Sequence, residues 1–155
     1  MLLEGNKAPS FEMPADDGST IRLSGLKGRV TVLYFYPKDD TSGCTAEAKD
    51  FTCLATQFEA AGATVIGISP DGAVSHAKFK KKHDLSVRLA ADEDKAVATA
   101  YGVWVEKSMY GKTYMGVERS TFLIGKDGKI ARIWNKVKVP GHAGDVLAAV
   151  KALKA

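Results

Sequence analysis

Cysteine is scarce in this chain of 155 residues, which contains only two. Two cysteines are too few for the disulfide framework of a small secreted protein. Long apolar runs are also missing: the longest nearly apolar stretch, Val30–Tyr36, is far shorter than the about 20 residues that a membrane-spanning helix needs. The first residues lack the basic and apolar regions of a secretory signal peptide. We therefore expect a cytoplasmic protein without a membrane segment.

A strong excess of one charge is lacking as well. The 22 basic and 18 acidic residues leave a net charge of +4, and the basic residues are scattered. The densest group, within Lys78–Lys82, is typical of a solvated helix face, with a docking surface as the alternative. No nucleic-acid-binding motif accompanies it, so we expect no nucleic-acid partner. The length and the 45% hydrophobic content fit a single globular domain spanning residues 1–155.

Strand patterns and helix patterns alternate along the chain. Strands are expected at 11–13, 21–23, 30–36, 63–69, 86–90, 119–124 and 130–134, and helices at 44–61, 71–83, 94–101 and 142–154 (His142 to Lys154). The first two strands and the last two form hairpins around turn-rich segments. The strands joined by helices predict parallel pairing, and the last hairpin adds antiparallel strands. This order predicts an α/β protein, a three-layer α/β/α sandwich with a mixed central sheet and an N-terminal β-hairpin.

Cys44 stands where the first buried strand gives way to a helix. Active sites of open α/β sheets lie at the carboxyl ends of strands. The amino end of a helix carries partial positive charge and unpaired N–H groups, which favour the thiolate, the nucleophilic form of cysteine. A small buried hydrophobic residue is the alternative, since free cysteine is often buried. The position of Cys44, three residues after Thr41, favours a reactive thiol.

The segment Phe35-Tyr-Pro-Lys-Asp-Asp-Thr-Ser-Gly-Cys-Thr-Ala-Glu47 resembles the active-site loop of peroxiredoxins. The likeness is strongest to the bacterioferritin-comigratory-protein (PrxQ-like) branch, whose members are thiol peroxidases on a thioredoxin-like fold. It extends over essentially the whole chain, from Gly5 to Ile124. It implies an antioxidant enzyme without a cofactor or metal, which reduces hydrogen peroxide and organic hydroperoxides. Thioredoxin, glutaredoxin or a small thiol would be the reductant, and the protein would be a monomer or a weak homodimer.

The same resemblance assigns roles to individual residues. Cys44 would be the peroxidatic cysteine, which passes through a sulfenic acid. Thr41 and Arg119 would activate the peroxide, and Pro37 would shape and shield the pocket. Glu47 matches a position that helps to orient the arginine.

The chemistry requires more than an ionised thiol. Full ionisation accelerates a thiol at pH 7 by only about thirtyfold, because about 3% of an ordinary thiol is already ionised there. The larger contribution must come from groups that stabilise the charge as the O–O bond breaks. The Thr41 hydroxyl, the planar guanidinium of Arg119 and the backbone N–H groups of Gly43 and Cys44 are the candidates.

Two positions depart from the family pattern. Ser42 replaces a usual proline, and Lys49 stands where many members of the branch have a resolving cysteine. The second cysteine, Cys53, follows Cys44 by nine residues, on the opposite face of the expected helix and about 13.5 Å further along it. Disulfide partners need Cα atoms within about 7 Å. We therefore expect an exposed Cys53 and a one-cysteine cycle, with an internal or an intermolecular disulfide as alternatives.

Two other functions and a metal site are alternatives to the peroxidase. A thioredoxin-fold disulfide oxidoreductase would need a second cysteine three residues from Cys44, which the chain lacks. A non-catalytic holdase or binding module would not consume peroxide. The two cysteines and three histidines lack the paired spacing of zinc ligands. The aromatic and methionine residues of segment 109–115 predict a loop, with the rim of a site or an interface as the alternative.

Overall fold

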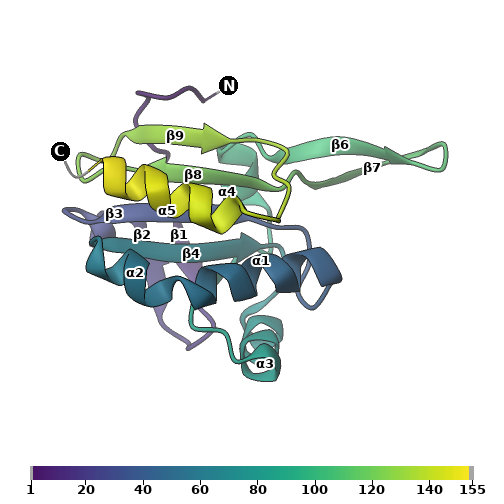
Figure 1. The fold of residues 1–155 in the computed structure, drawn as a ribbon. Helices are drawn as coiled ribbons and strands as arrows, with labels where there is room; N and C mark the ends of the chain where they lie inside the picture. Colours follow the sequence, from purple (N-terminus) through teal and green to yellow (C-terminus); the bar gives the residue numbers. More distant parts are fainter. Residues whose placement is uncertain (1, 154–155) are drawn as a thin grey trace.

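A five-stranded mixed sheet forms the centre of the computed structural model, which describes residues 2–153. Its order is β5-β4-β3-β8-β9, made of β3 (Val30–Phe35), β4 (Ala63–Ser69), β5 (Arg88–Ala91), β8 (Ser120–Ile124) and β9 (Ile130–Trp134). The strands β3, β4 and β5 are parallel. The strand β8 pairs antiparallel with both β3 and β9, and these three strands lie side by side in Figure 1. The mixed sheet predicted from the sequence is confirmed.

Each face of the sheet is covered by its own layer. The helices α1 (Ser42–Cys53), α2 (Ala55–Ala60), α3 (Ala73–His83) and α5 (His142–Ala152) contribute to the core on one face. The helix α4 (Ala96–Ala100) and the hairpin of β1 (Glu12–Pro14) and β2 (Thr20–Arg22) contribute to the core on the other. The three-layer, thioredoxin-like architecture and the N-terminal hairpin are thus confirmed. Among residues 2–153, no helix has the length and apolarity needed to cross a membrane.

The strand β3 fixes the position of α1. All six of its residues are buried, and their side chains alternate between the two cores. Tyr34 stacks on Phe51 of α1 with ring centroids 4.7 Å apart. The tyrosine ring in turn lies against Gly67 of β4, where a Cβ would come within 2.6 Å of it. Only glycine leaves room for this ring, and the stacked pair holds α1 against the carboxyl end of β3.

The structure differs from the expected elements in two regions. The helix expected at 44–61 is divided into α1 and α2 at Leu54, which leaves the helical conformation. The segment expected as a loop is a hairpin of β6 (Trp104–Met109) and β7 (Lys112–Val117), which projects from the body (Figure 1). Its two-residue turn, Tyr110-Gly111, has positive φ at both positions. Tyrosine is unusual in that conformation, so the turn signal was weak and the loop prediction was wrong.

The last helix, α5, begins at His142, whose ring packs edge-on against Phe51 and Trp134. Thr121 Oγ1 of β8 lies 2.7 Å from His142 Nε2. Burial lowers the pKa of His142 to about 4, and a cation at a helix N-terminus is also unfavourable. The helix ends at Ala152, and the expected end at Lys154 lies outside the described residues.

His142 is expected to make the protein sensitive to acid. The unfolded chain takes up a proton below its ordinary pKa of 6.5, whereas the folded protein resists protonation until about pH 4. Stability is therefore complete above pH 6.5 and falls by up to about 3 kcal/mol toward pH 4. Chemical denaturation of wild type and His142→Gln, which cannot titrate, measures this loss. Parallel stability profiles for the two proteins between pH 7.5 and 4 would contradict it.

Candidate active site

Cys44 lies in the first turn of α1, directly after the loop that leaves β3, and its side chain is almost completely buried. Arg119, the residue directly before β8, approaches it from the neighbouring segment. The Nη2 atom of Arg119 donates a hydrogen bond to Cys44 Sγ at 3.3 Å. The sulfur therefore faces both a guanidinium and the positive end of a helix, two features that stabilise negative charge.

Glu47 holds the arginine in this position. It follows Cys44 by three residues and so lies on the same face of α1. Its Oε1 accepts a hydrogen bond from Arg119 Nη1 at 2.7 Å, while Nη2 is left to reach the sulfur. Burial raises the pKa of Glu47 to about 7 against the opposing charge of Arg119. Its second oxygen, Oε2, has no hydrogen-bond partner among residues 2–153. One guanidinium thus bridges a buried carboxyl group and the Cys44 sulfur.

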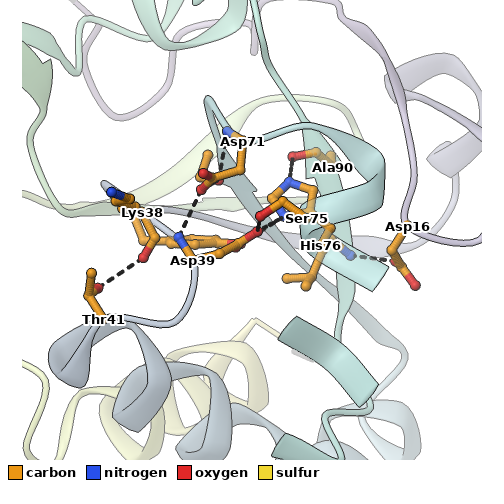
Figure 2. A network of polar contacts seen from close by, with 11 residues as sticks. Asp16, Lys38, Asp39, Thr41, Asp71, Ser75, His76 and Ala90 are labelled. Atoms are coloured by element: carbon orange, nitrogen blue, oxygen red, sulfur yellow. Dashed lines mark hydrogen bonds and ion pairs between the residues drawn. The ribbon is translucent and has the colours of Figure 1, made fainter. Parts of the chain in front are cut away.

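The other predicted residues line the start of α1. Thr41 is the N-cap residue, and its hydroxyl donates to the Lys38 carbonyl at 2.9 Å (Figure 2). With its proton engaged in this way, the Thr41 oxygen can accept a hydrogen bond from a peroxide, rather than donate one as the sequence suggested. Gly43 lies close to the arginine: a Cβ there would be 3.2 Å from Arg119 Nη2, so the guanidinium would have to shift by a few tenths of an ångström. Pro37 is half-buried at the start of the loop.

Cys53 lies at the opposite end of α1 from Cys44, and its predicted exposure is confirmed. Both cysteines are free. Two of the histidines already have acidic partners: Asp39 contacts His76, and Asp40 contacts His83. Among the described residues, no cluster of three histidine, cysteine or acidic side chains could hold a metal ion.

Reasoning from the sequence missed the polar network that supports the loop. Asp39 and His76 form a buried pair beneath it, although 37 residues separate them in the chain. The only sequence signal was a histidine in the helix that follows the next strand. Pairing over such a distance depends on the tertiary fold.

Comparison with known proteins places this chain in a family. The model of the AhpC/TSA family matches residues 5–133. The chain belongs to the AhpC/TSA family. A Coxiella burnetii protein named putative peroxiredoxin bcp is 48% identical over 143 residues, which are 92% of this chain and 95% of the relative. Peroxiredoxin Bcp of Bacillus subtilis is 48% identical over 147 residues, 95% of this chain and 94% of the relative.

Solved structures of this branch have the same fold. A Xanthomonas campestris bacterioferritin comigratory protein superimposes with a TM-score of 0.89 at 43% identity, covering 92% of this chain and 91% of the other. A Xylella fastidiosa PrxQ variant gives a TM-score of 0.94 at 38% identity and covers 100% of this chain and 99% of the other. The chain is a peroxiredoxin of the Bcp/PrxQ branch and therefore a thiol-dependent peroxidase. The family and the enzyme class predicted from the sequence are confirmed. A peroxide is its substrate and a thiol its reductant.

Proposed function

We propose that Cys44 is the peroxidatic cysteine, the nucleophile that attacks the peroxide and takes up one of its oxygen atoms. The observation that carries this proposal is the contact of 3.3 Å between Arg119 Nη2 and the buried Cys44 sulfur, with Glu47 fixing the other guanidinium nitrogen. The thiolate attacks one peroxide oxygen, the O–O bond breaks, and the sulfur is oxidised to a sulfenic acid. The departing hydroxide or alkoxide takes up a proton and leaves as water or an alcohol.

The surrounding groups would stabilise the charge that develops in this step. Arg119 keeps its positive charge at any relevant pH and presents several N–H groups in one plane. The backbone N–H groups at the start of α1, those of Gly43 and Cys44, add further donors, because the first turn of a helix leaves them without helical partners. The Thr41 oxygen would accept the hydrogen bond of the peroxide and so orient its O–O bond.

The substrates we propose are hydrogen peroxide and organic hydroperoxides. Support for the latter comes from the Xanthomonas campestris relative, whose structure is described in terms of alkyl peroxide reduction. The half-buried Pro37 would shield the reacting sulfur on the loop side. We place the enzyme in the cytoplasm, where thioredoxin, glutaredoxin or a small thiol can reduce it, and we propose a monomer or a weak homodimer.

Mass spectrometry after treatment with one equivalent of hydrogen peroxide tests this proposal. A sulfenic acid adds one oxygen to the protein, an internal disulfide removes two hydrogens, and an intermolecular disulfide doubles the mass. We expect the added oxygen to be on Cys44, trapped with a reagent specific for sulfenic acids. An unmodified Cys44 after the peroxide has been consumed would contradict the proposal.

The recycling step is expected to require one cysteine only. Cys44 and Cys53 occupy opposite ends of α1, so an internal bond would require most of this helix to unwind. Unwinding would also pull the fully buried Phe51 out of its stack with Tyr34. An external thiol can instead attack the sulfenic acid directly and release water.

The variant Cys53→Ser should therefore keep the steady-state rate of wild type. The assay is run once with a small thiol and once with a thioredoxin system, using whichever supports wild type. Loss of turnover, with the first equivalent of peroxide still consumed at the normal rate, would identify Cys53 as the resolving cysteine. A linked dimer that disappears in Cys53→Ser would assign it to an intermolecular bond.

A further inference from the structure

A buried contact between a histidine and a carboxyl group lies beneath the active-site loop. The His76 ring on α3 is fully inaccessible to solvent, and both of its nitrogens have partners. Nδ1 lies 2.8 Å from Asp39 Oδ2, and Nε2 lies 2.8 Å from the carbonyl oxygen of Ala90 on β5 (Figure 2). His76 therefore links the loop, through Asp39, to the edge strand β5.

The partners of the two ring nitrogens determine their protons. A carbonyl oxygen only accepts hydrogen bonds, so His76 Nε2 carries hydrogen. Asp39 accepts bonds from the Tyr36 hydroxyl at 2.6 Å and the Ser75 hydroxyl at 2.7 Å. Burial alone would raise the pKa of Asp39, but the hydrogen bonds from His76 and Tyr36 outweigh it and hold the pKa below its usual value. An ionised Asp39 only accepts, so Nδ1 donates as well and the ring is an imidazolium.

Asp39, whose carboxylate contacts this ring, also belongs to the active-site loop. The backbone N–H of Asp39 donates to Asp71 Oδ2 at 2.8 Å, and that oxygen also accepts from the Ser69 hydroxyl at 2.7 Å. Main chain and side chain of Asp39 are therefore held by different elements. Two residues later Thr41 caps α1, and its hydroxyl bonds back to the loop at Lys38 (Figure 2). Asp39 is thus held within the short segment that leads into α1.

We propose that Asp39 and His76 form a charged positioning pair that holds the active-site loop in its reactive geometry. Neither side chain touches the peroxide; each acts through the loop. The pair keeps the Thr41 oxygen and the first N–H groups of α1 aligned with the Cys44 sulfur. This inference rests on the proposed role of Cys44. Its effect falls on oxidation by peroxide, because only this step uses those groups together.

The chain offers a matched control for the pair. Asp40, the next residue, ties the same loop to the same helix by contacts of 2.7 Å to Lys82 Nζ and His83 Nε2. Its side chain is 43% exposed, so water can replace these contacts. Asp40 has φ of 58°, a conformation that asparagine tolerates. Asp39→Asn and Asp40→Asn therefore make the same chemical change in a buried and in an exposed bridge.

The experiment compares the two half-reactions in these variants. We expect Asp39→Asn to slow oxidation of Cys44 by the first equivalent of peroxide by at least tenfold, and Asp40→Asn by less than twofold. The rate at which a small thiol reduces the preformed sulfenic acid should stay within twofold in both. Equal oxidation rates in Asp39→Asn and wild type would overturn the proposal. Equal slowing of both half-reactions would also overturn it, because general destabilisation gives that result.

Two histidine variants provide a second test. In His76→Asn the amide nitrogen replaces Nδ1 and can still donate to Asp39, whereas in His76→Gln it replaces Nε2 and donates to Ala90. We expect Cys44 to be oxidised in His76→Asn at a rate closer to that of wild type than in His76→Gln. The reverse order would overturn the assignment of Asp39 as the partner that matters.

Nitrogen-15 NMR of the histidine rings tests the charge without an activity assay. We expect both ring nitrogens of His76 to carry hydrogen at pH 7 in wild type, and Nδ1 to lose it in Asp39→Asn. An unprotonated ring nitrogen in wild type would overturn the charged pair. If instead the NMR result holds and peroxide leaves Cys44 unmodified, the proposed function fails and the ion pair stands.

Discussion

Replacing Cys44 with serine is expected to abolish peroxide turnover while the protein stays folded. Serine is nearly isosteric with cysteine, so the buried site should survive, including the contact between Arg119 and Glu47. The serine hydroxyl, however, does not ionise at neutral pH and offers no sulfur to accept the oxygen. The loss should reach the limit of detection in a coupled assay with excess thiol donor and peroxide.

The matched control is Cys53→Ser, the same substitution at the exposed cysteine of the same helix. Its activity should remain, which excludes a general effect of removing a thiol from α1. Circular dichroism and thermal denaturation of both variants establish that they are folded. Turnover by Cys44→Ser above the background of the uncatalysed reaction would remove the peroxidatic role from Cys44.

The region around Cys44 was the most predictable part of the molecule. Its strand is a continuous apolar run, Pro37 ends that run, and a helix begins within a few residues. These are local signals, and each depends on only a short segment of chain. The position of Arg119 beside Cys44 did not follow from such signals, because it depends on the pairing of β8 with β3. Its placement was expected from the family resemblance alone.

Other features of the site depend on contacts that no local pattern contains. The Thr41 hydroxyl bonds to the carbonyl of Lys38, only three residues away, but the sequence does not show that the loop folds back to bring the two groups together. Gly43 lies close to a guanidinium that comes from a segment far away in the sequence. The Asp39–His76 pair likewise joins two elements through the tertiary fold. The sequence and the family resemblance therefore named the proposed reacting groups and Glu47, which holds Arg119, but not the Asp39–His76 pair beneath the loop.

Substituting Arg119 is expected to produce the second large loss of activity. Arg119→Met removes both the charge and the planar donors near the breaking O–O bond. The rate constant for oxidation of Cys44 should fall by about 2 to 4 kcal/mol equivalent, or roughly 30-fold to 1,000-fold. Arg119→Lys keeps the charge without the planar pair of donors, so its rate should lie between those of wild type and Arg119→Met. Stopped-flow mixing with peroxide, before any thiol is added, measures this step alone.

Arg119→Met also leaves the buried Glu47 without its cationic partner. The slower oxidation of Cys44 must therefore be separated from any effect of the unpaired Glu47. Burial already raises the pKa of Glu47 to about 7, so without Arg119 the carboxyl should hold its proton to still higher pH. The double variant Glu47→Gln/Arg119→Met removes the acidic group altogether. If Arg119 stabilises the transition state, the double variant should be as slow as Arg119→Met at every pH. Recovery of the rate in the double variant would show that Arg119 serves only to neutralise Glu47, and a near wild-type rate in Arg119→Met would assign it to structure alone.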